Sequence, residues 1–239
     1  MTIAKFVPKP IKFAIRRYLE RKSLHMSQAG QDLWVFGEVF NEERKGYFLD
    51  IGAHDGIYMS NTYLLECRYD WNGICVEANP ESFDQLKKNR RAICVNACLD
   101  SGDGVVDFAK RYLLSGILSP NTDNREPESH EVLQIKTQTL CSLLREQNAP
   151  HEIDYLSIDI EGAEERVLGN FNFNEYRFNC ISIERPTEPL RTIFKDNAYI
   201  LIKEIPGIDC FYVHQSFLHR YQTNLLKFYE KKYLTMRWR

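Results

Sequence analysis

Four acidic residues stand at the ends of short apolar runs, where buried strands are expected: Asp50, Glu77, Asp159 and Glu184. Because the carboxyl ends of parallel strands meet at one edge of a sheet, we expect these side chains to lie close together. Gathering carboxylates in a partly buried place costs free energy unless ligands or cations satisfy them. The spacing therefore indicates a ligand-binding edge.

A glycine turn follows the first of these acids, with three residues between Gly52 and Gly56. Glycine lets the backbone approach a ligand closely because it has no Cβ. A dinucleotide site needs G-x-G-x-x-G, but the middle glycine is absent here, and Asp50 and Asp55 would repel a pyrophosphate. This disfavours an NAD-dependent oxidoreductase. The acids suit S-adenosylmethionine instead, with its ammonium group near the turn and its ribose diol on Glu77.

Strands and helices are expected to alternate along the chain, and these elements position the acidic residues. Apolar runs predict strands at 47–51, 73–77, 92–95, 105–109, 153–158 and 178–184, with a closing hairpin of 198–204 and 208–213. Capping residues and apolar periodicity predict helices at 11–24, 33–40, 60–68, 80–89, 140–147, 163–168, 186–196 and 215–234. The pattern predicts an α/β fold with a doubly wound, mostly parallel seven-stranded sheet and an antiparallel terminal hairpin.

Residues 115–131 form a polar stretch without periodicity. A loop of this length in a compact domain is usually functional or disordered. We interpret it as a lid or an acceptor-binding segment, and a mobile surface insertion is the alternative.

Five ordered stretches resemble the FkbM family of S-adenosylmethionine-dependent methyltransferases. They are Ser27-Gln-x-Gly-Gln-Asp32, Gly46-Tyr-Phe-Leu-Asp-Ile-Gly-Ala-His-Asp-Gly56, Ser60-Asn-Thr-Tyr-x-Leu-Glu66, Trp71-x-Gly-Ile-Cys-Val-Glu-Ala-Asn-Pro80 and Ile158-Asp-Ile-Glu-Gly-Ala-Glu164. The resemblance runs from about residue 27 to 168 and weakens after residue 185. One departure is His54, where looser methyltransferase patterns have glycine and this family often has asparagine, so the local turn geometry stays open.

The resemblance implies a Rossmann-like methyltransferase fold and transfer of a methyl group to a hydroxyl oxygen, often on sugars of glycans, glycolipids or natural products. It also implies cofactor roles for the turn, for Glu77 and for the backbone near 96–98, with the Gln28 segment folding over the cofactor. The predicted cofactor-binding residues are Gln28, Gln31, Asp32, Asp50, Gly52, Ala53, Gly56, Asn61, Glu77, Ala78, Ala97, Cys98 and Asp159. For Asp32 the alternative is a helix cap.

Methyl transfer to a sugar hydroxyl needs alignment and a way to manage a poorly acidic proton. Asp159 and Glu161 straddle the end of a predicted strand, and Glu184 ends the neighbouring one. In one scheme Asp159 or Glu161 takes the proton directly. In the other, which we prefer, Asp159 and Glu184 hold Mg²⁺ or a similar divalent cation that acidifies the hydroxyl. Glu164 is interpreted as pairing with a helix N-terminus rather than as catalytic.

Charge is concentrated at the two ends of the chain. Residues 1–26 carry seven Lys/Arg with Glu20, and residues 220–239 carry six with Glu230, although the whole chain has a net charge of −2. We therefore expect a basic N-terminal helical extension at 1–26, the methyltransferase domain at 27–214 and a basic helix at 215–239 packed on it. Solvated basic faces explain this, and contact with an anionic membrane surface or a phosphate-bearing acceptor is the alternative.

No apolar run approaches the roughly 20 residues of a membrane helix, and no secretory signal is visible. Seven cysteines without a CxxC motif indicate a reduced protein with buried thiols. The expected location is thus cytoplasmic, with peripheral contact at the inner membrane face and self-association as further expectations, and no nucleic-acid partner. The predicted function is O-methylation of a sugar, glycan or glycolipid. The alternatives are O-methylation of a lipid or natural product, and a non-catalytic, membrane-associated adaptor that binds the cofactor.

Overall fold

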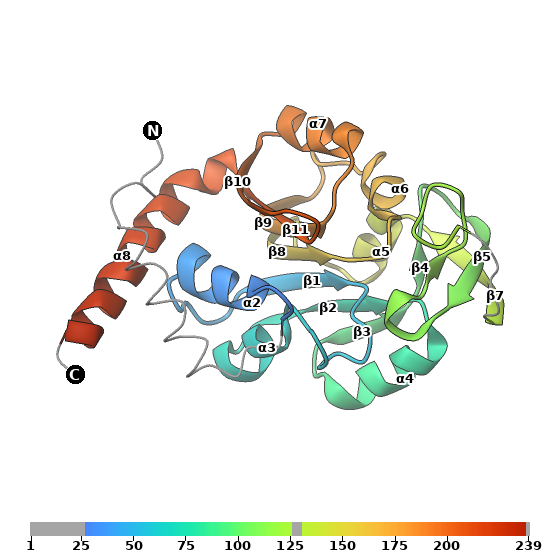
Figure 1. Cartoon of the computed structure of the whole chain (residues 1–239), viewed down its shortest axis with the longest axis horizontal. Coiled ribbons are helices and arrows are strands. Elements are labelled where there is room, and N and C mark those ends of the chain that lie inside the picture. Colours follow the sequence, from blue (N-terminus) through green and yellow to red (C-terminus); the bar gives the residue numbers. More distant parts are fainter. Residues whose placement is uncertain (1–26, 126–130, 238–239) are drawn as a thin grey trace.

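A computed structural model describes residues 27–125 and 131–237, with the side chains of residues up to 233. A seven-stranded sheet runs through the centre of the molecule (Figure 1), in the order β10-β11-β9-β8-β1-β2-β3. Its strands are β1 (Tyr47–Ile51), β2 (Asn72–Glu77), β3 (Ile93–Asn96), β8 (Glu152–Ile158), β9 (Arg177–Glu184), β10 (Tyr199–Ile205) and β11 (Asp209–His214). The predicted basic extension and the helix at 11–24 lie outside the described residues.

All neighbouring strands from β3 to β9 pair in parallel, and β11 pairs antiparallel with both β9 and β10. The predicted fold class is therefore confirmed, including the terminal hairpin. Strand order reverses beside β1, since β2 lies on one side of it and β8 on the other. In open α/β sheets such a switch point places ligands beyond the carboxyl ends of the strands.

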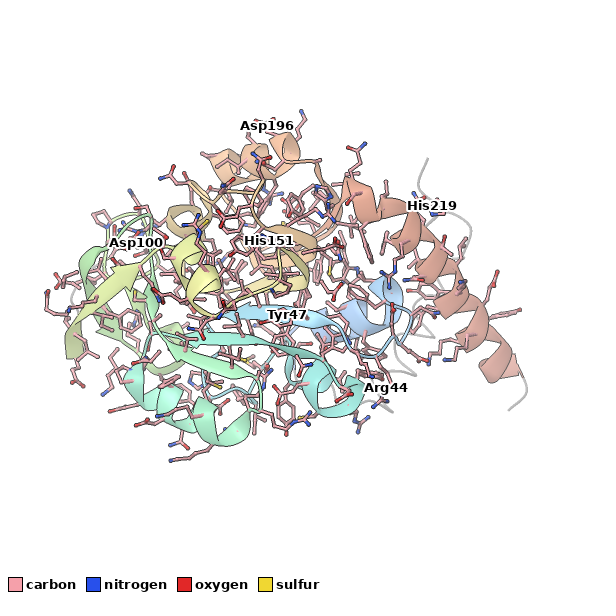
Figure 2. The ribbon with its side chains drawn as sticks, turned by 180° about the vertical axis from the view of Figure 1, so that it is seen from behind. Arg44, Tyr47, Asp100, His151, Asp196 and His219 are labelled. Atoms are coloured by element: carbon pink, nitrogen blue, oxygen red, sulfur yellow. The ribbon has the colours of Figure 1, made fainter. Side chains whose placement is uncertain are left out.

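Helices cover both faces of this sheet. One face carries α5 (Leu140–Glu146), α6 (Glu164–Leu168) and α7 (Glu188–Asp196), whose leucines join the strand residues in one apolar core. The other carries α2 (Gln31–Leu33), the π-helix η2 (Trp34–Val39), α3 (Tyr63–Tyr69), α4 (Pro80–Asn89) and α8 (Leu218–Arg237). Seen from behind, Tyr47 and His151 mark where β1 and β8 begin (Figure 2). The site considered below lies at the opposite ends of these strands.

Local capping explains where several helices start. Asn79 accepts a hydrogen bond from the Glu81 amide before α4, and Thr139 accepts one from the Ser142 amide before α5, so both helices start at the predicted residues. The helix expected from residue 186 begins at Glu188, because Thr187 is its cap. The helix expected at 33–40 is mostly a π-helix, in which the Phe40 amide bonds to the Val35 carbonyl.

A second, four-stranded sheet packs at the end of the molecule where β3 leads into β5, in the order β4-β7-β5-β6. Its strands are β4 (Cys98–Leu99), β5 (Gly104–Lys110), β6 (Gly116–Ile117) and β7 (Glu131–Gln138). The strand expected at 105–109 belongs to this sheet rather than to the central one. Part of the loop expected at 115–131 is ordered as β6 and a bend, and residues 126–130 lie outside the described part.

The C-terminal helix α8 packs along η2 through Tyr221, Leu225 and Phe228, all of which are buried. Several of its basic residues pair with acids of the domain: Arg220 with Glu43, and Lys231 and Lys232 with Glu42. The charge of this helix is thus partly neutralised within the fold. No helix in the described ranges has both the length and the apolar character needed to cross a bilayer.

Candidate functional site

The carboxyl ends of β1 and β8 meet at Gly52. The Asp159 amide donates to the Ile51 carbonyl over 3.1 Å, and the Gly52 amide donates to Val76 over 3.0 Å. Gly52 has φ +85°, and a Cβ there would lie 1.9 Å from the Asp159 carbonyl oxygen. Only glycine allows the two strand ends to come this close, so the turn and the first residue beyond β8 form one wall.

Two adjoining cavities open at this edge of the sheet. The large cavity has a volume of about 590 Å³, and the small cavity measures about 60 Å³. Four residues border both: Gly52, His54, Leu113 and Asp159. A volume near 590 Å³ is within the usual range for small-molecule sites, roughly 300–1,000 Å³.

Most of the predicted site residues lie around these cavities. The large cavity is bordered by Gln28, Gln31, Asp50, Gly52, Ala53, Asn61, Asp159, Glu161 and Glu184. The small cavity is bordered by Gly52, Glu77, Ala78, Ala97, Cys98 and Asp159. Residues chosen for cofactor binding and for acceptor chemistry are therefore brought to one connected site.

Two predicted cofactor residues border neither cavity. Asp32 is fully buried within α2, where it accepts a hydrogen bond from the Ser27 hydroxyl and another from the Leu33 amide. The N-cap of α2 is Gly30, without a side-chain hydrogen bond, so Asp32 does not have the capping role that the sequence left as an alternative. Gly56 has φ +80° and packs on Arg90, where a Cβ would lie 2.6 Å from Arg90 Cγ. Its lack of a side chain therefore serves the packing of the turn.

Glu77, at the end of β2, is held by backbone donors. Its Oε2 accepts from the His54 amide over 2.8 Å, and its Oε1 accepts from the Asn79 amide over 2.7 Å. Burial raises the pKa of Glu77 to about 7, although these backbone hydrogen bonds oppose the shift. The carboxylate is fixed in orientation beside the small cavity and keeps lone pairs free to accept from a ligand.

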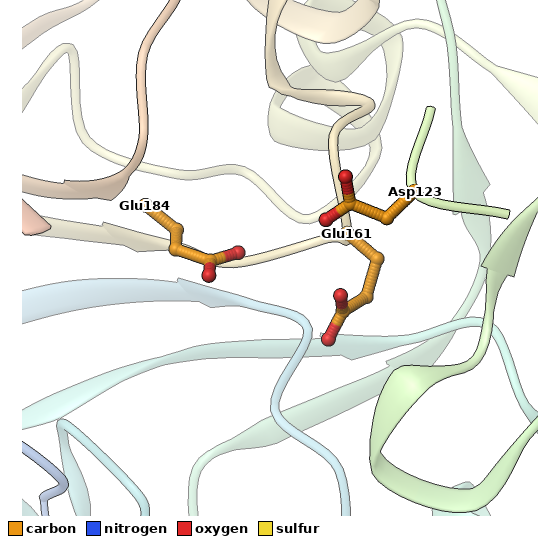
Figure 3. Close-up of side chains that lie close together, drawn as sticks. All are labelled: Asp123, Glu161 and Glu184. Atoms are coloured by element: carbon orange, nitrogen blue, oxygen red, sulfur yellow. The ribbon is translucent and has the colours of Figure 1, made fainter. Parts of the chain in front are cut away.

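Carboxylates gather on the far side of the large cavity. Asp123, Glu161 and Glu184 have oxygens within 4.8 Å of one another (Figure 3), and so do Asp159, Glu164 and Glu184. Burial raises the pKa of both Glu161 and Glu164 to about 7, with the charge of Glu184 contributing to both shifts. Asp159 faces the cavity, and its pKa is raised well above the ordinary value by burial, by the charge of Glu184 and by a hydrogen bond with it. These three carboxyl groups therefore keep their protons to a higher pH than ordinary ones.

Sequence reasoning missed the cation within this cluster. Arg185 directly follows β9, pairs with Glu184 over 2.9 Å and also pairs with Asp123. Asp123 comes from the segment expected to be a lid or acceptor-binding loop, and its amide donates to the Glu161 carbonyl over 2.9 Å. Arg185 thus joins this loop to the strand ends, a contact between residues 62 positions apart that no local pattern signals.

Glu164 lies in the first turn of α6, as expected, and His54 lies at the site. Glu164 accepts from the Ile160 amide over 2.9 Å, so it stabilises the turn before α6 while its carboxylate joins the cluster. His54 borders both cavities and packs edge-on against Tyr112, with 4.8 Å between ring centroids. Neither ring nitrogen of His54 has a hydrogen-bond partner among the described residues. His54, the residue of the glycine turn that departs from the family pattern, therefore faces the site.

These carboxylates could also hold a hard cation. Asp159, Glu164 and Glu184 offer oxygen ligands from two adjacent strand ends and a helix start. However, Glu164 already bonds to Ile160, and Arg185 already neutralises Glu184. The cluster therefore has its own cation, and its geometry is compatible with a metal without requiring one.

Comparison with known proteins gives one family and a set of similar folds. The model of the methyltransferase FkbM domain matches residues 50–201. The METTL16 methyltransferase domain is 13% identical, with 75% of this chain and 64% of that chain covered and a TM-score of 0.44. The methyltransferase FkbM from Methylobacillus flagellatus KT is 11% identical, with 85% and 59% covered and a TM-score of 0.45.

A TehB-like SAM-dependent methyltransferase from Corynebacterium glutamicum is 10% identical, with 87% of this chain and 100% of that chain covered and a TM-score of 0.37. The chain thus spans less than two thirds of the METTL16 and Methylobacillus structures. No curated protein matched. Identities this low, with TM-scores below 0.5, support no inference about activity, so the family assignment depends on the domain match alone.

Proposed function

The chain belongs to the FkbM family of methyltransferases, and we propose that it transfers a methyl group from S-adenosylmethionine to a hydroxyl oxygen of a sugar or glycan. The observation that carries this proposal is the meeting of two residue sets at one site. Asp50, Gly52 and Glu77 border the same two adjoining cavities as Asp159, Glu161 and Glu184.

The residues present fit the proposed cofactor. Asp50 offers a carboxylate to an ammonium group, and Glu77 offers fixed acceptors to a ribose diol. The small cavity has apolar walls from Val76, Leu99 and Phe108 that suit a purine ring. When bound, S-adenosylmethionine supplies a methyl group on a sulfonium, which is an excellent leaving group. The side chains must therefore align the acceptor and manage its proton.

We propose Glu161 as the group that takes the acceptor proton. It borders the large cavity, is only half-buried and has a pKa of about 7, close to that of an effective base at neutral pH. Arg185 supports this role because it pairs with Glu184 and Asp123, the two acids beside Glu161. Asp159 lies nearer the turn and would accept a hydrogen bond from the sugar.

A divalent cation on Asp159, Glu164 and Glu184 is the competing scheme for activating the hydroxyl. Such an ion would lower the pKa of the hydroxyl and orient a diol. Exhaustive dialysis against a chelator separates the schemes, because transfer through Glu161 alone survives the treatment. Loss of activity that returns with added Mg²⁺ or Mn²⁺ would assign the role to the ion instead.

Apolar side chains at the rim of the large cavity favour a second acceptor class. Tyr58, Met59 and Leu114 border it and are 51%, 39% and 50% exposed. Exposed apolar groups around a polar site suit an acceptor with an apolar part. The second candidate is therefore O-methylation of a lipid or an apolar natural product, with the sugar of a glycolipid as the case common to both.

The test is a transfer assay with cofactor labelled at the methyl group. Free sugars, nucleotide sugars, glycolipids and lipid alcohols are offered separately, with Asp159→Ala as the inactive control. Labelled product from sugar-bearing acceptors supports the proposal, and label on a nitrogen or carbon atom contradicts it. Binding of the demethylated cofactor without transfer to any acceptor would favour the non-catalytic adaptor.

A further inference from the structure

A buried arginine lies directly beneath the glycine turn of the site. Arg90 follows α4, and none of its side chain is exposed, while Asp50 and Glu66 beside it are 5% and 2% exposed. Burial of a guanidinium is costly unless its donors are satisfied. The contacts of Arg90 therefore show what this burial achieves.

Arg90 binds the loop that leads away from the turn at three places. Its Nη1 donates to the Gly56 carbonyl over 3.3 Å and to the Ser60 hydroxyl over 3.4 Å, and its Nη2 donates to the Thr62 hydroxyl over 2.9 Å. Because Gly56 has no Cβ, Arg90 can pack against it and reach its carbonyl oxygen. One side chain thus fixes both ends of the loop from Gly56 to Thr62.

The Thr62 hydroxyl relays this interaction to Asp50. A guanidinium only donates hydrogen bonds, so the Thr62 oxygen must act as acceptor toward Arg90. Its own proton is then directed to Asp50 Oδ2, 2.5 Å away. The direct distance from Arg90 Nη1 to Asp50 is 3.8 Å, so the threonine is the hydrogen-bonded link. This arrangement orients one oxygen of Asp50 and favours its ionised form.

The two buried carboxylates of this cluster differ in their partners. Arg90 Nε bonds directly to Glu66 over 2.8 Å, and Glu66 also accepts from the Arg91 amide over 2.7 Å. Arg91 Nε lies 3.7 Å from Glu66 as well, so Glu66 pairs with two guanidiniums, whereas Asp50 lies 3.8 Å from Arg90. Burial raises the pKa of Asp50, against the influence of Arg90, Thr62 and Ser157. Asp50 borders the large cavity and Glu66 borders neither cavity, so Asp50 is the carboxylate placed to meet a positive charge of a ligand.

We propose that Arg90 is a positioning residue for cofactor binding, acting through Thr62 to present Asp50 to the ammonium group of the amino-acid end of the cofactor. The proposal rests on the proposed function, because it assumes that S-adenosylmethionine occupies this edge. It assigns separate tasks to two acids: Glu66 neutralises Arg90, and Asp50 receives the ligand.

The test compares two ligands in Thr62→Val, which removes the relay but keeps the shape of the side chain. S-adenosylhomocysteine has the amino-acid end, and 5′-methylthioadenosine lacks it. The expected loss is about tenfold to a hundredfold in affinity for S-adenosylhomocysteine, as for a charge-assisted hydrogen bond. Affinity for 5′-methylthioadenosine should change by less than about twofold. Thr62→Ser restores the hydroxyl and should restore the affinity for S-adenosylhomocysteine.

Controls separate this role from a general loss of structure. Thr137→Val removes another buried hydroxyl, which bonds to the Gly102 carbonyl in the small sheet, and should leave both affinities unchanged. Arg90→Lys keeps the charge without the fork of donors and should reproduce the selective loss of S-adenosylhomocysteine affinity. Equal weakening of both ligands in Thr62→Val would overturn the positioning role alone. Failure of the wild-type chain to bind S-adenosylhomocysteine would overturn the proposed function itself.

Discussion

Cofactor affinity should depend on pH through Glu77. Burial raises the pKa of this group to about 7, whereas the proposed ribose contact needs the ionised acceptor. A group with a pKa of about 7 is ionised in roughly one molecule in eleven at pH 6 and about ten in eleven at pH 8, so the Kd should be about tenfold weaker at pH 6. Affinity therefore rises with pH and levels off above the pKa.

The substitution Glu77→Gln tests the same reasoning at constant pH. Glutamine keeps one oxygen acceptor but loses the charge and faces two backbone donors with an amide group. Loss of one charge-assisted hydrogen bond corresponds to about 1.5–3 kcal/mol, or roughly a tenfold to hundredfold weaker Kd at pH 8. The variant should also bind with little pH dependence.

Isothermal titration with S-adenosylhomocysteine between pH 6 and pH 8 measures both effects. His54→Asn is an essential control, because His54 borders both cavities and its amide donates to Glu77. Glu188→Gln changes an exposed glutamate of α7 and should behave as wild type. A pH-independent wild-type Kd, or a pH dependence that survives in Glu77→Gln and disappears in His54→Asn, would refute the argument.

Three further substitutions have clear expected outcomes. Glu161→Gln should lower kcat by about 10²- to 10⁴-fold without changing the Kd for S-adenosylhomocysteine, and a loss below tenfold in single-turnover assays would point to Asp159. Gly52→Ala places a Cβ 1.9 Å from the Asp159 carbonyl and should lose at least about 1–3 kcal/mol in urea unfolding, whereas Gly102→Ala has open space and should not. Leu143→Ala, in the buried core, should lose about 2–5 kcal/mol, and an unchanged unfolding midpoint would contradict the packing described.

The acids at the strand ends could be predicted because hydrophobic periodicity and residue polarity are local properties of the sequence. Asp50, Glu77, Asp159 and Glu184 each close an apolar run, and parallel pairing then brings these ends to one edge. The strand β7 was missed even though Leu133, Ile135 and Thr137 alternate with more exposed residues. This two-residue period could have identified it, but the polar segment before it masked the signal.

The partners of the acids could not be predicted, because they depend on contacts between distant segments. Arg90 and Arg185 look like ordinary surface cations in the sequence, yet one is fully buried and the other joins a strand end to Asp123. Gly56 was assigned to the ligand because glycine turns often approach one, but here it approaches Arg90. A glycine in a sequence indicates a close approach, but it does not identify the atoms that approach.

The insertion of β11 between β9 and β10 has a consequence for synthesis. β10 pairs with no strand other than β11 among the described residues, so it cannot join the sheet before β11 has been synthesised. The edge of β9, which carries Glu184 at its end, also pairs with β11. A nascent chain that stops before Asp209 therefore leaves the edge of β9 and the whole of β10 without their partner strand, and unpaired strand edges favour aggregation.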